Sequence, residues 1–576
     1  MTEPDITFEN FSFSYEETKE PALKNINLRI KKGEVVLVTG PAGAGKSTLC
    51  CCINGLIPHF YSGKIEGKIL VKGVDTQALT IGQLNTQVGL VFQDPESQLF
   101  NFTVEDEIAF GPENLGIEPD KVNALVDEMI RRVRLEGYNK RNPLTLSGGE
   151  KQACAIASIL AMSPNIVIFD EPTSNLDPIG TQSVLQLITD LAKREKKTMI
   201  IVEHNLADLV TKVDRMIVMQ DGGILFDDSP KEVFRHVDKL KEIGVNIPQS
   251  TQLLLRLSEA NLVPSETCMT MNEVYEFISS KLDATRFEKA KTYILEKEEA
   301  PAGTEPIIVV DNLTHLYPEG NVEALRGVNL KVYPGDFMAI IGQNGSGKTT
   351  LVKHFNGLLK PTTGKVYVKG VDTSTSTVAK LARTVGYCFQ NPDHQIVKNV
   401  VREEIAFGPK NLGVPDDEIE KRIEEITTKL NIHKYLDEDP HELSKGNKAR
   451  VNLAGVLAMK PDVLIVDEPL TGQDFKEAKA IMDLLMDLNR EGKTIIIITH
   501  EMMFAAEYTR RIIVMNKGAM LYEGTPKQVY TKKDILEATS LTEPEITQLG
   551  FKLCGVPDIT TIDELYNIIA GKEVTG

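Results

Sequence analysis

The feature that most constrains this chain is an internal repeat of whole-domain length. Several motifs occur twice in the same order, about 300 residues apart. GPAGAGKST at 40–48 returns as GQNGSGKTT at 342–350, and LSGGEKQ at 146–152 returns as LSKGNKA at 443–449. Solenoid units repeat every ~20–50 residues, so a period this long indicates a complete domain. The chain is therefore predicted to contain two copies of one fold, and the differences between the copies become informative.

Further motifs repeat with the same spacing. VFQDPESQ at 91–98 returns as CFQNPDHQ at 388–395, and FDEPTSNLDP at 169–178 returns as VDEPLTGQDF at 466–475. An apolar segment ending in His204 returns as one ending in His500.

Composition limits the functional classes. The 576 residues are 41% hydrophobic and 25% charged, which is typical of a globular protein. The net charge of −18 argues against a nucleic-acid or ribosome partner bound through its phosphate backbone, because such binding needs a basic surface. The acidic N-terminus predicts no signal peptide. The longest apolar runs are far shorter than the ~20 residues that span a bilayer, so the chain is not expected to cross a membrane by itself. The seven cysteines lack metal-site spacing and are predicted to be reduced structural thiols.

Apolar segments predict the strands of each half. Continuous apolar runs ending in polar residues are typical of strands buried on both faces of a parallel sheet. The expected strands of this kind are 35–39, 166–169 and 199–202 in the first half and 337–341, 463–466 and 494–498 in the second. Each half opens with two further β-like segments, which are 6–15 and 22–30 in the first half and 307–317 and 324–332 in the second. Helix-rich stretches are expected at 118–135 and 416–430.

Each half ends in a tail expected to form short helices. SPKEVF at 229–234 matches TPKQVY at 525–530, and a weaker match continues through 272–280 and 561–569. The charged segment with prolines and glycines before residue 307 is predicted to be a linker. The predicted divisions are 1–235 and 307–530 for the two cores, 236–288 and 531–576 for their extensions, and 289–306 for the linker.

The two glycine-rich segments have the chemistry of phosphate loops. The pattern G-x-x-x-x-G-K-[ST] after a strand lets backbone N–H groups and a helix N-terminus face a phosphate. Lys46 and Lys348 are expected to bridge the β- and γ-phosphates, and Ser47 and Thr349 to bind Mg²⁺. The residues expected to line the loops are Gly40, Pro41, Ala42, Gly43, Ala44, Gly45, Lys46, Ser47, Thr48, Gly342, Gln343, Asn344, Gly345, Ser346, Gly347, Lys348, Thr349 and Thr350.

Acidic pairs end two of the apolar strands. Asp170 and Asp467 are placed to hold Mg²⁺, and the next residues, Glu171 and Glu468, to polarise an attacking water as general bases. His204 and His500 close neighbouring strands, where an imidazole could reach the γ-phosphate. A single histidine at a strand end is usually a packing residue, but the repetition favours function here.

This set of motifs resembles the nucleotide-binding domain of ABC ATPases, and the resemblance covers both halves. It implies an α/β P-loop NTPase fold. Each domain would have a mixed or parallel sheet core, an antiparallel β subdomain, a helical subdomain and a small C-terminal helical tail. It implies an ATPase with ATP and Mg²⁺ as ligands.

By position, Tyr15 and Tyr317 resemble the aromatic residue that stacks on adenine. Gln93 and Gln390 resemble the Q-loop glutamine, which touches Mg²⁺ and senses a transmembrane partner.

The family's signature and D-loop motifs complete the implied nucleotide site. They correspond to Ser147, Gly148, Gly149, Glu150 and Asp177 in the first half, and to Ser444, Lys445, Gly446, Asn447 and Asp474 in the second. In that family two domains meet head to tail, and each ATP lies between one phosphate loop and the other domain's signature. The second signature carries Lys445 where a glycine belongs, and its D-loop carries Gln473 where the first half has Leu176. We therefore expect two ATP sites with unequal turnover, although a tolerated substitution without kinetic effect stays open.

The segments after the Q-loop glutamines narrow the resemblance. Both share a P-[DE]-x-Q-[IL] pattern and lead into EDEIAFGPENLGI at 105–117 or REEIAFGPKNLGV at 402–414. These segments resemble the ATPases of energy-coupling-factor (ECF) importers, which take up vitamins and transition-metal ions. The resemblance implies a motor peripheral to the cytoplasmic side of the cell membrane. Its implied partners are an integral membrane scaffold subunit and a membrane substrate-binding subunit.

The same resemblance assigns a role to two acidic residues. Glu96 and Asp393 would face an arginine of the scaffold's coupling helix, and the alternative is that they are solvated helix-cap acids. Two other functions stay open: an ATPase of another ABC transporter, and a soluble tandem ABC ATPase acting on ribosomes or nucleic acid. The sequence does not identify the transported compound.

Overall fold

The computed structural model describes residues 4–16, 20–174, 176, 178–283, 287, 305–318, 322–556 and 558–572. The chain forms two compact units. The first comprises residues 1–248, 266–270 and 474–476, and the second comprises residues 249–265, 271–473 and 477–576. Each unit contains a six-stranded sheet and a four-stranded sheet.

The six-stranded sheet of the first unit is parallel apart from one edge strand. Its order is β10-β9-β3-β8-β7-β6, and only β10 runs antiparallel to its neighbour. Its strands are β3 (Val35–Thr39), β6 (Val88–Val91), β7 (Ile166–Asp170), β8 (Thr198–Val202), β9 (Arg215–Gln220) and β10 (Gly223–Asp228). All residues of β3, β6, β7 and β8 are buried, as the continuous apolar runs predicted.

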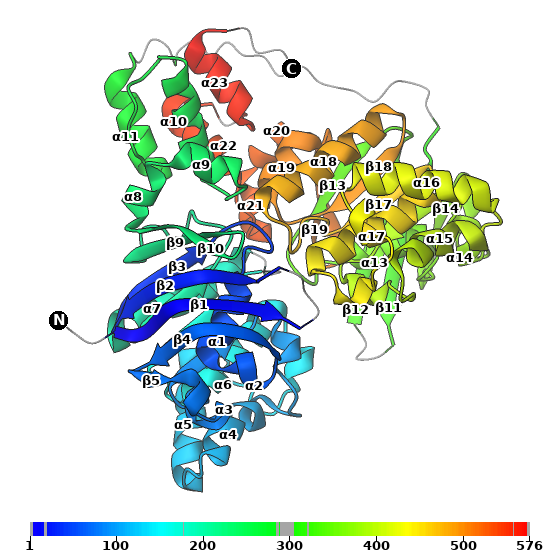
Figure 1. Ribbon diagram of the computed structural model, residues 1–576. Helices are drawn as coiled ribbons and strands as arrows, with labels where there is room; N and C mark the ends of the chain where they lie inside the picture. The colour runs from blue at the N-terminus through cyan, green and yellow to red at the C-terminus, as the bar shows by residue number, and fades with distance from the viewer. Residues whose placement is uncertain are drawn as a thin grey trace. The chain divides into compact units, whose positions relative to one another are not determined.

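One face of this sheet packs against the antiparallel sheet, whose order is β2-β1-β4-β5. The strands are β1 (Pro4–Tyr15), β2 (Leu23–Lys31), β4 (Gly63–Val71) and β5 (Val74–Asp75). Figure 1 shows these blue strands beside α1. Alternate residues of β3 divide between the two cores: Val36 and Val38 face the antiparallel sheet, and Leu37 faces the helices.

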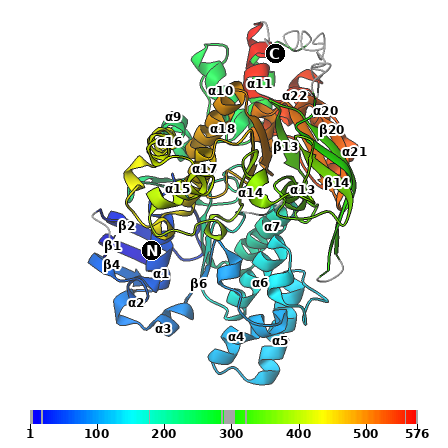
Figure 2. The same cartoon turned by 90° about the vertical axis from the view of Figure 1, so that its right-hand side faces the viewer.

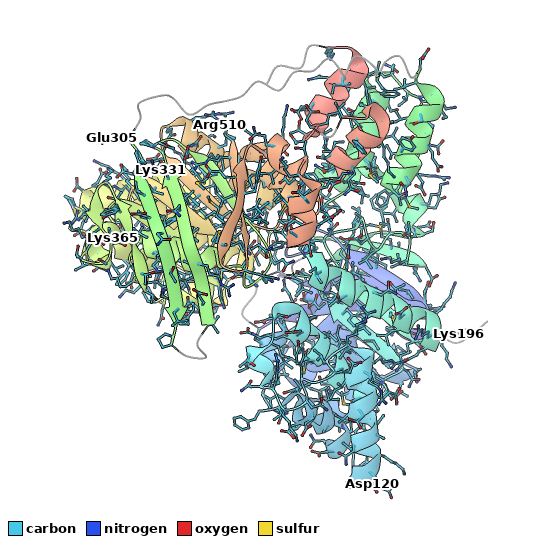
Figure 3. The ribbon with its side chains drawn as sticks, turned by 180° about the vertical axis from the view of Figure 1, so that it is seen from behind. Asp120, Lys196, Glu305, Lys331, Lys365 and Arg510 are labelled. Atoms are coloured by element: carbon cyan, nitrogen blue, oxygen red, sulfur yellow. The ribbon has the colours of Figure 1, made fainter. Side chains whose placement is uncertain are left out.

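Helices cover the opposite face and form the helical subdomain, in which α4 packs against both α5 and α6 (Figure 2). Asp120, labelled in Figure 3, lies in the first turn of α5. The helices of the first unit are α1 (Lys46–Asn54), α2 (Leu56–His59), α3 (Ile81–Asn85), α4 (Val104–Asn114), α5 (Pro119–Arg132), α6 (Gly148–Ala161), α7 (Pro178–Glu195), α8 (Pro230–Phe234) and α9 (Val237–Glu242), with 3-10 turns η1 (Thr76–Ala78), η2 (Pro95–Ser97) and η3 (Pro143–Thr145).

The second unit repeats both sheets. The six-stranded order is β16-β17-β18-β13-β19-β20 and the four-stranded order is β12-β11-β14-β15. Its strands are β11 (Ile308–Tyr317), β12 (Val322–Val332), β13 (Phe337–Ile341), β14 (Thr363–Val368), β15 (Val371–Asp372), β16 (Val385–Cys388), β17 (Val463–Asp467), β18 (Thr494–Ile498), β19 (Arg511–Asn516) and β20 (Ala519–Gly524).

The helices of the second unit follow the same plan. They are α13 (Lys348–Phe355), α14 (Val378–Leu381), α15 (Val401–Asn411), α16 (Asp416–Lys429), α17 (Lys445–Ala458), α18 (Phe475–Arg490), α19 (Met502–Tyr508), α20 (Pro526–Tyr530) and α21 (Lys533–Thr539), with 3-10 turns η5 (Pro392–His394), η6 (His433–Tyr435) and η7 (Pro440–Glu442). The predicted fold class is confirmed in both units: a P-loop α/β core, an antiparallel sheet and a helical subdomain.

Four tail helices form one module within the second unit. They are α10 (Gln249–Glu259), α11 (Met271–Lys281), α22 (Glu545–Cys554) and α23 (Ile562–Ala570). α10 packs against both α22 and α23, and α11 packs against α22. The hydroxyl of Ser250 donates to Glu545 Oε1 at 2.7 Å, and the guanidinium of Arg256 lies 4.1 Å from the ring centre of Tyr566. The tail of the first half is therefore built into a module with the tail of the second.

Most of the predicted linker lies outside the described residues, and the predicted domain limits stay predictions. Six of the seven cysteines are buried, and Cys51 is half-buried. Among the helices of the described ranges, none combines the length and the apolar character needed to cross a membrane.

One difference between the two cores is a buried pair of histidines in the second unit. In the second unit, His354 Nε2 lies 3.2 Å from His315 Nδ1, and His354 Nδ1 lies 2.8 Å from the carbonyl of Thr350. The corresponding residues of the first unit are Cys52 and Phe13. Burial lowers the pKa of His354 to about 4, so this imidazole is neutral at pH 7.

This shift predicts an acid sensitivity specific to the second unit. Because the pKa is lower in the folded state, the unfolded chain binds the proton first as the pH falls below 6.5. The free energy of unfolding should therefore fall by up to about 1.4 kcal/mol per pH unit from this group between pH 6.5 and about 4. Thermal unfolding of the chain at pH 7.0 and 5.5 measures the loss. His354→Cys, which introduces the residue of the first half, should reduce the loss of stability between the two pH values. An acid dependence identical to that of the wild-type chain would show that His354 is not its source.

Candidate active site

Both phosphate loops run directly from a buried strand into a helix. In the first unit the loop joins β3 to α1, and in the second it joins β13 to α13. Gly40 and Gly342 have φ of 145° and 148°, and a Cβ on either would lie 2.2–2.3 Å from the carbonyl oxygen of Met219 or Met515. No side chain fits there, so glycine is required for the loop to pass the neighbouring strand.

The loop lysines are held inside their own loops. Lys46 Nζ donates to the carbonyls of Gly40 and Pro41 at 3.0 and 2.9 Å, and Lys348 makes the equivalent two bonds at 2.7 and 2.9 Å. Burial lowers the pKa of Lys46, while Glu171 and Asp170 oppose that shift. Each amine is thus fixed at the mouth of a ring of backbone N–H groups, where it can pair with phosphate oxygens.

The predicted adenine-stacking tyrosines lie beside the loops. The hydroxyls of Tyr15 and Thr48 are 3.2 Å apart, and those of Tyr317 and Thr350 are 3.3 Å apart. The structure therefore brings the end of β1 or β11 to the first turn of the loop helix in each unit. An adenine ring over this tyrosine would leave its phosphates at the loop.

The strand-end aspartates fit a hard cation. Asp467 Oδ2 accepts from the hydroxyl of Thr349 at 2.8 Å, and Asp170 accepts from Ser47. The other carboxylate oxygen of each aspartate is buried without a hydrogen-bond partner among the described residues. Burial, and then the neighbouring glutamate, raise the pKa of each to about 6. A buried oxygen of this kind next to a hydroxyl is a donor set suited to a divalent cation.

The second aspartate has a contact that sequence reasoning missed. Tyr387, in β16, donates its hydroxyl to Asp467 Oδ2 at 2.8 Å. Burial and the charge of Asp467 raise the pKa of this phenol, so it stays protonated and donates. The corresponding residue of the first half is Leu90. A tyrosine within an otherwise apolar strand is a signal that could have identified it.

Glu171 is the centre of a hydrogen-bond network in the first unit. Its carboxylate accepts from Gln93 Nε2 at 2.6 Å and from the Ser174 hydroxyl at 3.0 Å, and it lies 3.0 Å from His204 Nε2. Burial raises its pKa, but His204 and then Lys46 outweigh that effect and lower it to about 2. The structure thus brings together the predicted glutamate, Q-loop glutamine and histidine, with the carboxylate ionised.

The second unit keeps the central part of this arrangement. Glu468 Oε2 lies 3.0 Å from His500 Nδ1. Burial lowers the pKa of His500, but the charge and hydrogen bond of Glu468 outweigh it and raise the pKa to about 9. Gln390 lies two residues beyond β16, as Gln93 does beyond β6.

Both glutamates adopt a left-handed backbone conformation. Glu171 has φ of 48° and Glu468 has φ of 52°. Non-glycine residues in this region cost about 1–3 kcal/mol and persist only where the surroundings impose them. Here the amide of each glutamate donates to the end of the neighbouring strand, at Val202 O and Ile498 O. This backbone turn directs the carboxylate toward the histidine.

Sequence reasoning also missed Glu203, which directly precedes His204. Glu203 Oε1 accepts from the backbone N–H of Thr173 at 3.0 Å, and burial raises the pKa of its carboxyl to about 7. The second half has Leu470 and Thr499 at these two positions. The acidic residue directly before His204 in the sequence is a signal that could have identified this position.

The signature segments begin helices, as expected. Ser147 caps α6 and Ser444 caps α17, each accepting from a backbone N–H in the first turn. In the first helix Glu150 also accepts from the Ser147 N–H at 2.8 Å, which completes a capping box. Asn447 stands in its place in the second helix, and the described contacts show no such reciprocal bond there.

Three further site residues can be placed. Asp474 is buried just before α18, whereas Asp177 lies outside the described residues. Glu96, in η2, forms an ion pair with Lys151 of α6, and Asp393, in η5, lies 2.7 Å from Lys448 of α17. Both acids are half-exposed and both lysines are largely covered. The two lysines were not predicted, because their contact joins segments 55 residues apart.

Comparison with known proteins agrees with this geometry. The sequence family described as ABC transporter matches residues 23–174 and 325–471, which contain both phosphate loops and both strand-end carboxylate pairs. The chain belongs to the ABC transporter family. An ABC transporter ATP-binding protein of Methanosarcina acetivorans is 38% identical over 99% of this chain and 94% of its own length. One of Caldanaerobacter subterraneus is 40% identical over 96% and 97%. The chain is thus a fused tandem ABC ATPase that binds and hydrolyses ATP.

Single ABC cassettes of known structure align with part of this ABC ATPase. CbiO1 of Clostridium perfringens, described as part of the ABC transporter complex cbiONQ, is 38% identical. It covers 42% of this chain and 98% of its own, with a TM-score of 0.37. The cassette MJ0796 bound to ADP and Pi is 29% identical and covers 38% of this chain and 98% of its own, with a TM-score of 0.36.

The network around the glutamates leads to a first kinetic prediction. We expect Glu171→Gln combined with Glu468→Gln to lower kcat for ATP hydrolysis by about 10²–10⁴-fold, because neither site then has a carboxylate to accept the proton of water. ATP affinity should be retained, since the loops and tyrosines are unchanged. Steady-state phosphate release and titration with a fluorescent ATP analogue measure the two quantities. Glu118→Gln, on an exposed helix cap, is the control; a parallel loss of affinity would contradict a catalytic role.

Proposed function

We propose that this ABC ATPase is the motor of an ECF-type importer. It would couple ATP hydrolysis to the uptake of a vitamin, a metal ion or a similar micronutrient. The observation that carries the ATPase part is the repeated assembly of phosphate loop, buried aspartate and glutamate–histidine pair, present in both units. The ECF part is supported by the sequences that follow the two Q-loop glutamines.

We infer that the two halves act as an intramolecular head-to-tail dimer. Each ATP would lie between one phosphate loop and the signature of the other half, with Asp177 and Asp474 beside it. Closing the dimer would bring the N–H groups of a signature helix to the γ-phosphate. Hydrolysis would remove the ligand that both halves share and let the dimer open.

Mg²⁺ is the proposed metal at both sites. Ser47 and Asp170 would hold it in the first half, and Thr349 and Asp467 in the second, with Gln93 and Gln390 nearby. Bound Mg²⁺ would neutralise charge on the phosphates during transfer. The chain's own glutamates and histidines would orient the attacking water and receive its proton.

A docking surface for a membrane partner is proposed beside each Q-loop. In the first unit it combines the half-exposed Glu96 with three exposed aromatic residues: Phe100, Phe102, which is 83% exposed, and Phe110. The rings of Phe100 and Phe110 meet edge to face, with centroids 4.8 Å apart. Exposed apolar side chains around a carboxylate suit an amphipathic helix that carries a cation.

The partners would be an integral membrane scaffold and a membrane substrate-binding subunit. The carboxylates of Glu96 and Asp393 would each pair with an arginine of the scaffold, in competition with Lys151 and Lys448. The ATPase would then be peripheral to the cytoplasmic side of the membrane. Specificity for the transported compound would lie in the substrate-binding subunit.

The two ATP sites should contribute unequally to turnover. The second loop would work with the LSGGE signature and the first loop with LSKGN. We therefore expect Glu468→Gln to remove a larger share of the steady-state ATPase rate than Glu171→Gln does. Phosphate release by each single variant measures the shares. Equal losses would contradict the asymmetry and leave the ATPase assignment intact.

Co-purification tests the proposed importer. The tagged chain, extracted from membranes of its own host in mild detergent, should retain an integral membrane protein in stoichiometric amount. Glu96→Lys combined with Asp393→Lys should weaken that association roughly 30-fold or more, because reversing a buried interfacial charge costs at least about 2 kcal/mol. Glu118→Lys reverses a more exposed acid elsewhere and should retain the partner. Co-sedimentation with ribosomes and no membrane partner would overturn the importer assignment.

A further inference from the structure

The second signature is tied to its own D-loop by contacts of residues that differ from those of the first half. These contacts lie wholly within the second unit, between the start of α17 and the segment that leads into α18. They involve the residues by which the two signatures and the two D-loops differ. The differences are therefore linked in space as well as in sequence.

Two of the contacts are close packing of the D-loop backbone against the start of the signature helix. A Cβ on Gly472, whose φ is 74°, would lie 3.5 Å from three carbons of the Lys445 side chain. The aliphatic stem of the lysine therefore lies along the D-loop backbone. A Cβ on Gly446 would meet the carbonyl oxygen of Gly472 at 3.0 Å, so the first turn of the signature helix and the D-loop are already in contact.

Three polar side chains reinforce this packing. Gln473 Nε2 donates to the carbonyl of Gly446 at 3.0 Å, and Gln473 Oε1 accepts from Arg450 Nη2 at 3.4 Å. Arg450 Nη2 also lies 2.7 Å from Glu477 Oε1. Gln473 and Arg450 are only 7% and 8% exposed. Removing one member of a buried hydrogen-bonded charge pair leaves the other uncompensated, so these residues depend on one another. We call Arg450, Gln473 and Glu477 the signature brace.

The three residues of the signature brace are not repeated in the first half of the sequence. Its three corresponding residues are Ala153, Leu176 and Gly180. Leu176 is buried, and a Cβ on Gly149 would lie 3.1 Å from the Cα of Gly180. The first signature is thus held by apolar contact and a complete capping box. The second is held by hydrogen bonds and an ion pair that join it to its own D-loop and to α18.

We propose that Arg450, Gln473 and Glu477 are positioning residues for ATP hydrolysis at the site served by the second signature. The brace holds the Gly446 carbonyl, and with it the first turn of α17, against the D-loop. The N-terminal N–H groups of LSKGN then remain aligned for a γ-phosphate although Lys445 replaces a glycine and Asn447 cannot complete a capping box. This inference rests on the proposed function, in which that signature closes over the first phosphate loop.

The test separates the two sites by silencing each in turn. In the Glu468→Gln background, residual hydrolysis comes from the first loop with the second signature. Adding Gln473→Leu, the residue of the first half, should lower kcat there about tenfold or more and change KM for ATP less than about twofold, since a misplaced donor acts mainly on the transition state. In the Glu171→Gln background the same change should alter kcat by less than about twofold. Lys479→Ala, on the exposed face of α18, is the control and should have no effect in either background.

Arg450 variants distinguish positioning from packing. Arg450→Lys keeps a cation beside Glu477 but removes Nη2, the one nitrogen that contacts both Glu477 and Gln473. It should therefore fall between the wild-type chain and Arg450→Ala in kcat in the Glu468→Gln background. Equal losses for the two Arg450 variants would overturn the assignment of a hydrogen-bonded role.

A second measurement does not depend on residual turnover. Trapping 8-azido-ATP with orthovanadate, cross-linking it with ultraviolet light and identifying the labelled peptides reports the two ATP sites separately, because the azide lies on the adenine ring of each nucleotide. Gln473→Leu alone should reduce labelling of the first-half site about tenfold. Labelling of the second-half site should stay unchanged. Equal reduction at both loops, or none at either, would overturn the inference. An inactive wild-type chain would instead overturn the proposed function, so the two failures are distinct.

Discussion

The close approach of each phosphate loop to a neighbouring strand is the contact on which the nucleotide sites depend. The backbone of Gly40 passes the carbonyl of Met219 in β9, and Gly342 passes Met515 in β19, at distances that no side chain allows. The loop conformation is therefore tied to the parallel pairing of β3 with β9, and of β13 with β19. On the other side of β3, the parallel pairing with β8 and then β7 brings the ends of those strands to the same edge of the sheet. The lysine, carboxylates and histidine meet there because burial of the apolar strands aligns those ends.

The parts of the fold that repeat a local pattern could be predicted from the sequence. Strands β3, β13 and β18 have the predicted limits, because each is a continuous apolar run bounded by polar residues. The loops, strand-end carboxylates and histidines could be predicted because their chemistry depends on residue type at short spacing. In edge strands such as β10, buried and exposed residues do not alternate regularly. The sequence pattern of such strands therefore does not distinguish them from loops.

Contacts between distant segments could not be predicted in the same way. Lys151 pairs with Glu96, and Gln473 reaches the carbonyl of Gly446, only because helices and loops far apart in sequence meet in the folded unit. Neither pairing has a periodic signal. The packing of α10 against α23 is a further example, since each helix is amphipathic by itself and its partner is set by tertiary structure. Sequence patterns thus identify the groups that carry chemistry, and the folded structure identifies the groups that hold them.

The two halves differ mainly in these supporting groups. Both keep a loop lysine, an orphaned aspartate oxygen and a glutamate–histidine pair, whereas Tyr387 and the signature brace occur in the second half alone. The altered positions of the second signature also satisfy one another. Gly472 leaves room for the stem of Lys445, and Gln473 accepts from Arg450 while donating to Gly446. A damaged copy of LSGGE would leave buried polar groups unpaired at this point, at a cost of about 1–3 kcal/mol each. The LSKGN segment is instead a packed arrangement with its own support, so its departures from LSGGE are accommodated by the surrounding fold.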